Sequence, residues 1–192
     1  MARSQQPAGL GHLARTLAIS ATAAAGLALA EPATVPIGVA LASDGPVDIA
    51  QGVSISPAPG WAVGHRGPNW VALSKTDGSA QLRVAVKQAD GTDIAAILRN
   101  DMNHYAASTG LTNLRTLNAP TPEPVQSANF QQKVFIDYTA DVSAPQGPIP
   151  VLGAFTELLN ASNHLSAFVD FRQNNEATPQ AVEDGGTMIR SL

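Results

Sequence analysis

Two runs of alternating side chains, joined by a tight-turn sequence, constrain this chain more than any other feature. In residues 70–75 (WVALSK) and again in residues 81–88 (QLRVAVKQ), apolar residues fall at every second position. Such alternation is the pattern of a β-strand with one buried face. Between the two runs, Asp77-Gly78 readily adopts the positive φ angles of a tight hairpin. These residues therefore predict an antiparallel hairpin, and with it an antiparallel sheet.

Further strands are expected on both sides of this hairpin. Alternating or β-rich sequences bounded by turn residues cover residues 53–56, 61–63, 111–117, 133–142, 151–159 and 165–173. A short edge strand is also expected at residues 47–49. The proline-rich segment 119–124 is predicted to be unpaired because proline has no backbone N–H.

Two helices complete the pattern. Residues 94–105 repeat apolar side chains at helical spacing, with Thr92 as the expected N-cap and Gly110 as the expected stop. A second helix is expected after Thr178-Pro179. Gly185-Gly186 weakens it by roughly 1 kcal/mol per glycine, so packing must stabilise it. We expect it on the face of the sheet that mixes polar and apolar residues.

The order of strands, helix, strands and final helix defines the α+β class. We expect one antiparallel sheet of about six to eight strands, covered by helices. A chain of 192 residues suits one core of this size. The protein is expected to be a monomer.

The N-terminus predicts export. Residues 1–16 carry Arg3 and Arg15 and no acid, and residues 17–30 are apolar or small and end in Ala28-Leu29-Ala30. A basic start, an apolar run and small residues at its end are the parts of a secretory signal peptide. We therefore expect a protein that is secreted or held in the cell envelope, in a periplasm-like space.

This interpretation divides the chain into three parts. Residues 1–30 are expected to be the signal peptide, residues 31–51 a flexible tether rich in Ala, Pro and Gly, and residues 52–192 a single α+β domain. Cleavage is expected after Ala30. Cleavage after Ala42, or retention of the segment as a membrane anchor, stays open.

Charge and cysteine content exclude several classes of function. The formal net charge is -4, and removing residues 1–30 takes away two of 11 basic residues and none of 15 acids, leaving 9 minus 15, or -6. A nucleic-acid-binding protein is therefore not expected. The chain has no cysteine, which excludes a disulfide, a thiolate metal site and a lipid on an N-terminal cysteine. Membrane association would need an uncleaved anchor or a partner.

No motif predicts catalysis. The sequence lacks Gly-x-Ser-x-Gly and a phosphate-binding glycine loop, and none of the histidines after the signal peptide has metal-ligand spacing. We therefore expect no catalytic residue, no metal and no cofactor. The charged strand residues are interpreted as partly solvated cross-strand pairs; they are Arg83, Lys87, Asp137, Asp170 and Arg172. Glu183-Asp184 is interpreted as part of a solvated helix face.

A candidate contact site surrounds a Gly/Pro turn. Trp61, His65, Arg66 and Trp70 lie within ten residues, and aromatic residues with arginine dominate binding hot spots. Burial in the core would explain either tryptophan without a function, because burial of such a side chain contributes roughly 1.5–3 kcal/mol. We expect Trp61 to be in the core, and for Trp70 core and surface are equally open.

The chain resembles a family of secreted proteins. Residues 53–63 (VSISPAPGWAV), the strands WVALSK and AQLRVAVKQ, and the terminal helix opening TPQAVED resemble actinobacterial, especially mycobacterial, proteins of the LpqN/LpqT type. The resemblance implies a Mog1/PsbP-like α/β/α sandwich and a non-enzymatic accessory or binding module of the cell envelope. It brings no catalytic residues. The lipid-bearing cysteine of the family's lipoproteins is missing here, so lipid anchoring is not implied.

Three functions follow as hypotheses. The first is an envelope interaction module that binds a protein partner. The second is a carrier or sensor of an apolar, lipid-like ligand held between the sheet and a helix. The third is a hydrolase, which the missing nucleophile motif disfavours.

Overall fold

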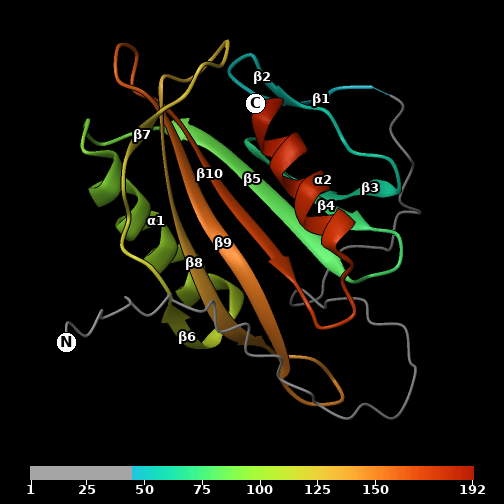
Figure 1. The fold of residues 1–192 in the computed structure, drawn as a ribbon. Coiled ribbons are helices and arrows are strands. Elements are labelled where there is room, and N and C mark those ends of the chain that lie inside the picture. The colour runs from blue at the N-terminus through green and yellow to red at the C-terminus, as the bar shows by residue number, and fades with distance from the viewer. Residues whose placement is uncertain (1–44) are drawn as a thin grey trace, which may run out of the picture.

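The structure is a computed structural model that describes residues 45–192 (Figure 1). The predicted signal peptide (1–30), both cleavage sites, and most of the tether (31–51) lie outside the described residues. Within residues 45–192, neither helix has the length and apolar character needed to cross a membrane.

The described residues contain ten strands and two helices. In chain order these are β1 (Val47–Ala50), β2 (Val53–Ile55), β3 (Trp61–Arg66), β4 (Trp70–Lys75), β5 (Ala80–Gln88), α1 (Ile94–Thr109), β6 (Thr112–Thr116), β7 (Glu123–Pro124), β8 (Gln132–Val142), β9 (Ile149–Asn160), β10 (Leu165–Gln173) and α2 (Pro179–Arg190).

One antiparallel sheet organises the fold. Its strand order is β3-β4-β5-β10-β9-β8-β6, with β7 paired to β8, which makes eight strands. The predicted hairpin is present as β4 and β5, and Gly78 has a φ of 75° in its turn. These findings confirm the α+β class and the antiparallel sheet. The proline-rich segment, predicted to be unpaired, contributes the two-residue strand β7.

The N-terminal strands form a second, two-stranded sheet. β1 pairs with β2, so the strand expected at residues 47–49 is present. Val47 and Ile49 are buried in the same apolar cluster as Trp61 and Leu82. The packed core therefore includes residues upstream of Gly52.

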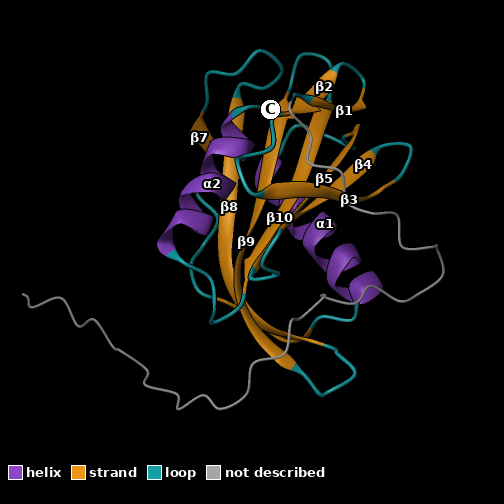
Figure 2. Cartoon of the chain, turned by 90° about the vertical axis from the view of Figure 1, so that its right-hand side faces the viewer, coloured by secondary structure: helices purple, strands orange, loops and turns teal. Residues whose placement is uncertain are grey.

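The two helices lie on opposite sides of the main sheet (Figure 2). α1 packs on the face that carries Phe155 and Phe168, whereas α2 shares a cluster with Val169 and Phe171. The expectation that α2 covers the mixed face is wrong for β5 and β10, whose apolar side faces α2 and the β1–β2 sheet. On β8 the apolar side chains, such as Val134 and Ile136, face α1 instead. α1 can cover the mixed face because the polar side chains there bond to one another.

The helix ends follow the sequence with one correction. Asp93, not Thr92, is the N-cap of α1, and its Oδ1 accepts hydrogen bonds of 3.1 Å from the backbone N–H groups of Ala95 and Ala96. Thr92 lies one residue too early for this geometry. Gly110 ends the helix in the left-handed conformation, with φ of 68°, as predicted.

α2 begins as predicted, and its contact with the sheet explains the glycine at position 185. Thr178 is the N-cap and Pro179 occupies the first turn. A Cβ atom on Gly185 would lie 2.6 Å from the ring of Phe171 on β10. The missing side chain therefore lets α2 approach the sheet closely, which offsets the low helix propensity of glycine.

Candidate functional site

Trp61 belongs to the core on the α2 side of the sheet, as expected. Its side chain is 2% exposed, and its Nε1–H donates a 3.0 Å hydrogen bond to Asp184 Oδ2 on α2. Lys75 Nζ lies 3.5 Å from the same oxygen. The interpretation of Asp184 as part of a solvated helix face is therefore wrong. This carboxylate ties α2 to β3 and β4.

Trp70 lies on the opposite face of the sheet. It pairs with Ala85 on β5, and the guanidinium of Arg83 lies 3.9 Å from the centre of its ring. The indole is half-buried, and a side chain on Gly67 would collide with it. An arginine over an aromatic face is a favourable cation–π contact.

The four predicted contact residues do not form one surface. Trp61 and Trp70 point to opposite sides of the sheet, while His65 and Arg66 are exposed at the end of β3. Arg66 Nη2 donates a 3.2 Å hydrogen bond to the backbone oxygen of Asp48. A contact role for His65, Arg66 and the exposed edge of Trp70 stays a prediction.

Asp170 is the centre of a buried polar cluster beneath α1. It is 1% exposed and accepts hydrogen bonds from the Tyr138 hydroxyl at 2.6 Å and the Tyr105 hydroxyl at 2.9 Å. Arg172 Nε lies 3.8 Å away and also donates to Gln81 Oε1 at 2.9 Å. The interpretation of Asp170 and Arg172 as partly solvated is wrong, because both are buried and bonded to partners far apart in sequence.

Burial sets the protonation behaviour of this cluster. Desolvation raises the pKa of Asp170, and the Arg172 charge and the two tyrosine hydroxyls act against that rise. Desolvation also raises the pKa of Tyr105 and Tyr138 far above the usual range, and the neighbouring carboxylate adds to that rise. Both tyrosines therefore remain neutral hydrogen-bond donors.

A glycine in β9 makes room for this cluster. A Cβ atom on Gly153 would lie 2.6 Å from the Tyr138 ring and 2.5 Å from the backbone oxygen of Phe171. Glycine inside a strand marks a close approach of neighbouring atoms. Gly153 in the predicted strand 151–159 is thus the sequence feature that could have indicated a buried ring here.

A second buried polar group, Glu157, lies under α1 nearer its N-terminal half. Glu157 is 0% exposed and accepts a short hydrogen bond from the Ser166 hydroxyl, while Asp101 on α1 forms an ion pair with Lys87. Desolvation raises the pKa of Glu157 to about 8, and the Asp101 carboxyl adds to the rise. Lys87 therefore pairs with the helix, not with a neighbouring strand.

Neither buried cluster has the geometry of a reaction site. Asp170, Glu157 and Ser166 are each at most 1% exposed, so a substrate cannot reach them without displacing α1. The hydrogen bond from Tyr105 to Asp170 and the ion pair between Asp101 and Lys87 connect α1 to the sheet. Among residues 45–192, no group of three or more His, Asp or Glu side chains could hold a metal ion.

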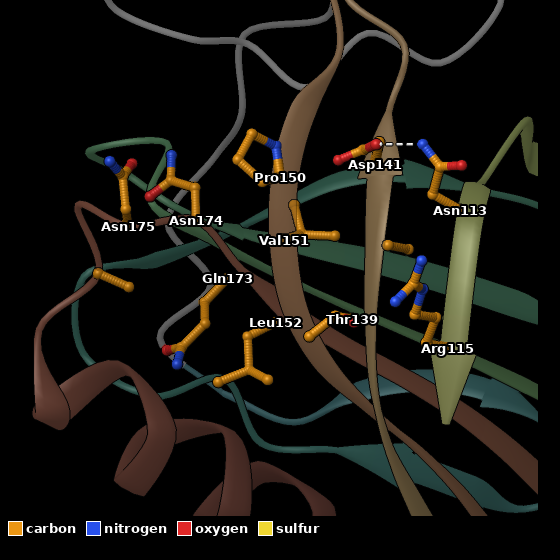
Figure 3. Close-up of a pocket in the computed structure, with 12 residues that line it drawn as sticks. Asn113, Arg115, Thr139, Asp141, Pro150, Val151, Leu152, Gln173, Asn174 and Asn175 are labelled. Atoms are coloured by element: carbon orange, nitrogen blue, oxygen red, sulfur yellow. Dashed lines mark hydrogen bonds between the residues drawn. The ribbon is translucent and has the colours of Figure 1, made fainter. Parts of the chain in front are cut away.

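An open cleft of about 800 Å³ lies where β8 and β9 extend past α2 (Figure 3). A row of four directly paired residues crosses it from strand to strand: Arg115 on β6 faces Thr139 on β8, Thr139 faces Leu152 on β9, and Leu152 faces Gln173 on β10. All four side chains line the cleft. We call these four residues the transverse row.

The transverse row presents groups with unused bonding capacity. Arg115 is exposed and forms no hydrogen bond or ion pair with the residues that the structure describes. Gln173 Oε1 is shielded from solvent and lacks a hydrogen-bond partner there, and Leu152 is 45% exposed. This site was not predicted from the sequence, because the residues that line it come from separate strands and are brought together only by strand pairing.

The rest of the cleft is rich in amides. Asn113 Nδ2 donates a 2.6 Å hydrogen bond to Asp141 Oδ2, so that carboxylate already has a partner. Asn174 and Asn175, in the segment between β10 and α2, also line the cleft (Figure 3). The cleft thus combines one cation, one bonded carboxylate, several carboxamides and an apolar floor.

Comparison with known proteins shows the fold. The chain is similar to the crystal structure of Mog1p, a Ran-binding protein from Saccharomyces cerevisiae, with a TM-score of 0.51 and 12% identity over 72% of this chain and 87% of that one. This similarity supports the predicted Mog1/PsbP-like fold. A protein from Bacteroides thetaiotaomicron VPI-5482 matches with a TM-score of 0.33 and 8% identity over 70% of this chain and 43% of that one. No family model and no curated protein match the sequence.

Proposed function

We propose that this chain is a non-enzymatic interaction module that binds a partner protein through the cleft at the end of its sheet. The observation that carries the proposal is a contrast between two sets of polar groups. The acidic groups beneath α1 are sealed from solvent, whereas Arg115 in the open cleft is exposed and has unused bonding capacity. A site of this kind offers recognition without an acid–base pair or an activated nucleophile.

The fold supports the same proposal. The similar Mog1p is described as a Ran-binding protein, so at least one protein of this fold acts by binding another protein. Fold alone does not carry a function, and the proposal does not transfer Ran as the partner. The exposed residues of the cleft carry the argument for this chain.

The proposed place of action is the cell envelope. Support comes from the signal-peptide pattern of residues 1–30 and from the LpqN/LpqT-like sequences of residues 53–63 and 70–88. In this proposal the mature protein is a tether followed by one folded domain. With no cysteine in the chain, it acts without a lipid on a cysteine.

The carrier hypothesis ranks second. A lipid-like ligand would need room between the sheet and a helix, yet the side chains at those positions pack closely. Leu98 and Phe155 fill the α1 side, and Leu82 and Met188 fill the α2 side, all with 0% exposure. A hydrolase ranks third because the serine in the buried cluster, Ser166, is sealed.

Photo-crosslinking in the host cell tests the proposal. A photoreactive residue at Leu152 should give a discrete adduct with one protein, and Arg115→Gln should weaken that adduct. The same residue at Asn103, which is exposed on α1, should give none. Equal adducts from both positions, or none from Leu152, would contradict the proposal.

Native mass spectrometry of protein purified from its host separates the competing functions. An interaction module is expected at its bare mass. Co-purification of a lipid-sized additional mass would favour the carrier, and labelling by a serine-directed probe would favour the hydrolase.

A further inference from the structure

We infer that the transverse row recognises an extended peptide segment of the partner, with a carboxylate on Arg115 and an apolar side chain on Leu152. This inference rests on the proposed function and names the chemistry that its cleft would bind. It follows from the order of the four groups, from their spacing and from their bonding state.

Charge complementarity assigns the first position. Most lysines and arginines in residues 45–192 already have partners, such as Lys75 with Asp184 and Lys133 with Glu123. Arg115 has none among the described residues and lies at the open edge of the sheet. A guanidinium binds a carboxylate through two parallel hydrogen bonds. Asp141 lines the same cleft, and its negative charge disfavours a polyanion such as nucleic acid.

The middle of the row requires an apolar group. Leu152 is 45% exposed, and Pro150, two positions earlier on β9, lies on the same face and also lines the cleft. Among the lining residues that the structure describes, none has an aromatic side chain on which a sugar ring or a base could stack. An aliphatic side chain fits this floor and would gain roughly 25 cal/mol for each Å² of apolar surface that it buries.

The far end of the row suits a peptide group. Gln173 Oε1 is shielded from solvent, so this half-buried carboxamide would contribute its NH2 group, as a donor to a peptide carbonyl. The exposed carboxamide of Asn175 offers both a donor and an acceptor to neighbouring peptide groups, whereas Asn174 Oδ1 already accepts a 2.9 Å hydrogen bond from the backbone N–H of Glu176. Because the backbone of β8, β9 and β10 is already paired, side chains must do the recognition here, unlike in the addition of a peptide to a sheet edge.

The spacing fits one backbone conformation. Arg115 and Leu152 are two strand positions apart, which corresponds to about 10 Å. In a polyproline II helix, residues i and i+3 lie on one side about 9 Å apart. The inferred ligand thus has an acidic residue at i and an apolar residue at i+3.

A titration with defined peptides tests the inference. The probe is acetyl-Asp-Pro-Pro-Leu-Gly-amide, added at millimolar concentration to the isotope-labelled full chain while NMR chemical shifts are recorded. Saturable shifts should appear at Thr139, Leu152 and Gln173. Replacing Asp by Asn in the peptide should weaken binding by about tenfold, as should Leu by Ser.

Matched variants of the protein complete the test. Arg115→Gln should abolish the difference between the Asp and Asn peptides, and Arg99→Gln, at an exposed and unpaired arginine on α1, should leave it unchanged. A peptide with Asp and Leu two positions apart should bind more weakly than the probe. Chemical shifts outside the cleft report whether each variant keeps the fold.

Several results would overturn the inference. These are no saturable shift with any peptide, shifts at another surface, equal binding of the Asp and Asn peptides, or saturation of the same residues by maltotriose instead. If the Leu152 crosslink persists in cells but none of the peptides binds, the proposed interaction module is retained and the assignment of an extended peptide as its ligand is wrong. If neither a Leu152 crosslink nor peptide binding is observed, the proposed function is wrong as well.

Discussion

Glu157 on β9 and Asp101 on α1 each hold one buried carboxylate oxygen that has no hydrogen-bond partner among the described residues, Glu157 Oε2 and Asp101 Oδ2. Their other oxygens are engaged, by Ser166 and by Lys87 respectively. Two such carboxyl groups are compatible when Glu157 carries a proton, because a carboxylic acid can donate where a carboxylate can only accept.

The first prediction concerns stability against pH. The pKa of Glu157 is raised by burial from 4.5 to about 8, so between those values the folded protein binds more protons than the unfolded chain. The protonated Glu157 therefore makes its full contribution to the free energy of unfolding below pH 4.5. This contribution is lost as pH rises through 8, and the free energy of unfolding falls by up to about 1.4 kcal/mol per pH unit. Urea denaturation over this pH range measures it.

Glu157→Gln provides the comparison. Its amide can still donate toward Asp101 but does not titrate, so the variant should lose this slope and exceed the wild type in stability above pH 8. An unchanged slope in the variant would show that Glu157 is ionised in the folded protein. Asp141→Asn, at a half-buried carboxylate that accepts a hydrogen bond from the Asn113 carboxamide, should leave the slope as it is.

The second prediction concerns the Asp170 cluster. Tyr138→Phe removes a 2.6 Å hydrogen bond to a buried carboxylate, and hydrogen bonds to charged groups contribute about 1.5–3 kcal/mol. The free energy of unfolding should fall by that amount. In an Asp170→Asn background the same substitution should cost less, and a double-mutant cycle measures the difference. Equal costs in both backgrounds would exclude a direct coupling.

The third prediction uses two adjacent glycines of α2. Gly185→Ala should destabilise the protein by about 1–3 kcal/mol, because its methyl group would enter the space of the Phe171 ring. Gly186→Ala meets only the flexible end of Arg190 at 3.4 Å, and it should stabilise the helix by up to about 1 kcal/mol. Thermal unfolding of the two variants should therefore shift in opposite directions.

The fourth prediction separates the two tryptophans. In Trp70→Phe, emission comes from Trp61 alone and should be blue-shifted and protected from acrylamide, since Trp61 is 2% exposed. In Trp61→Phe, the half-buried Trp70 should be quenchable in the free protein. A blue-shifted and unquenchable Trp70 would end its candidacy as a contact residue.

Local patterns predicted the elements of this fold well. The alternation in residues 70–88, the turn at Asp77-Gly78 and the stop at Gly110 act through backbone geometry within a few residues. Such local conformational preferences can be recognised in a single sequence. The α+β class followed from the order of those elements.

The hydrogen-bond partners of the buried polar residues could not be predicted from local sequence patterns. Asp170 bonds to Tyr105, which is 65 residues away, and Arg172 bonds to Gln81, which is 91 residues away. When those partners are unknown, a strand face that mixes polar and apolar residues is interpreted as partly solvated. For that reason α2 was expected to cover that face. The cleft has the same origin, since only strand order places Arg115 in line with Gln173.

The position of β10 also determines how the two parts of the sheet are joined. β10 is the middle strand of the path, paired to β5 on one side and β9 on the other, yet it is the last strand of the chain. Until it is synthesised, the meander β3–β5 and the hairpin β8–β9 have no shared partner and each keeps an open edge. β10 therefore completes the sheet through contacts that are far apart in sequence, and contacts of this kind are associated with slower folding.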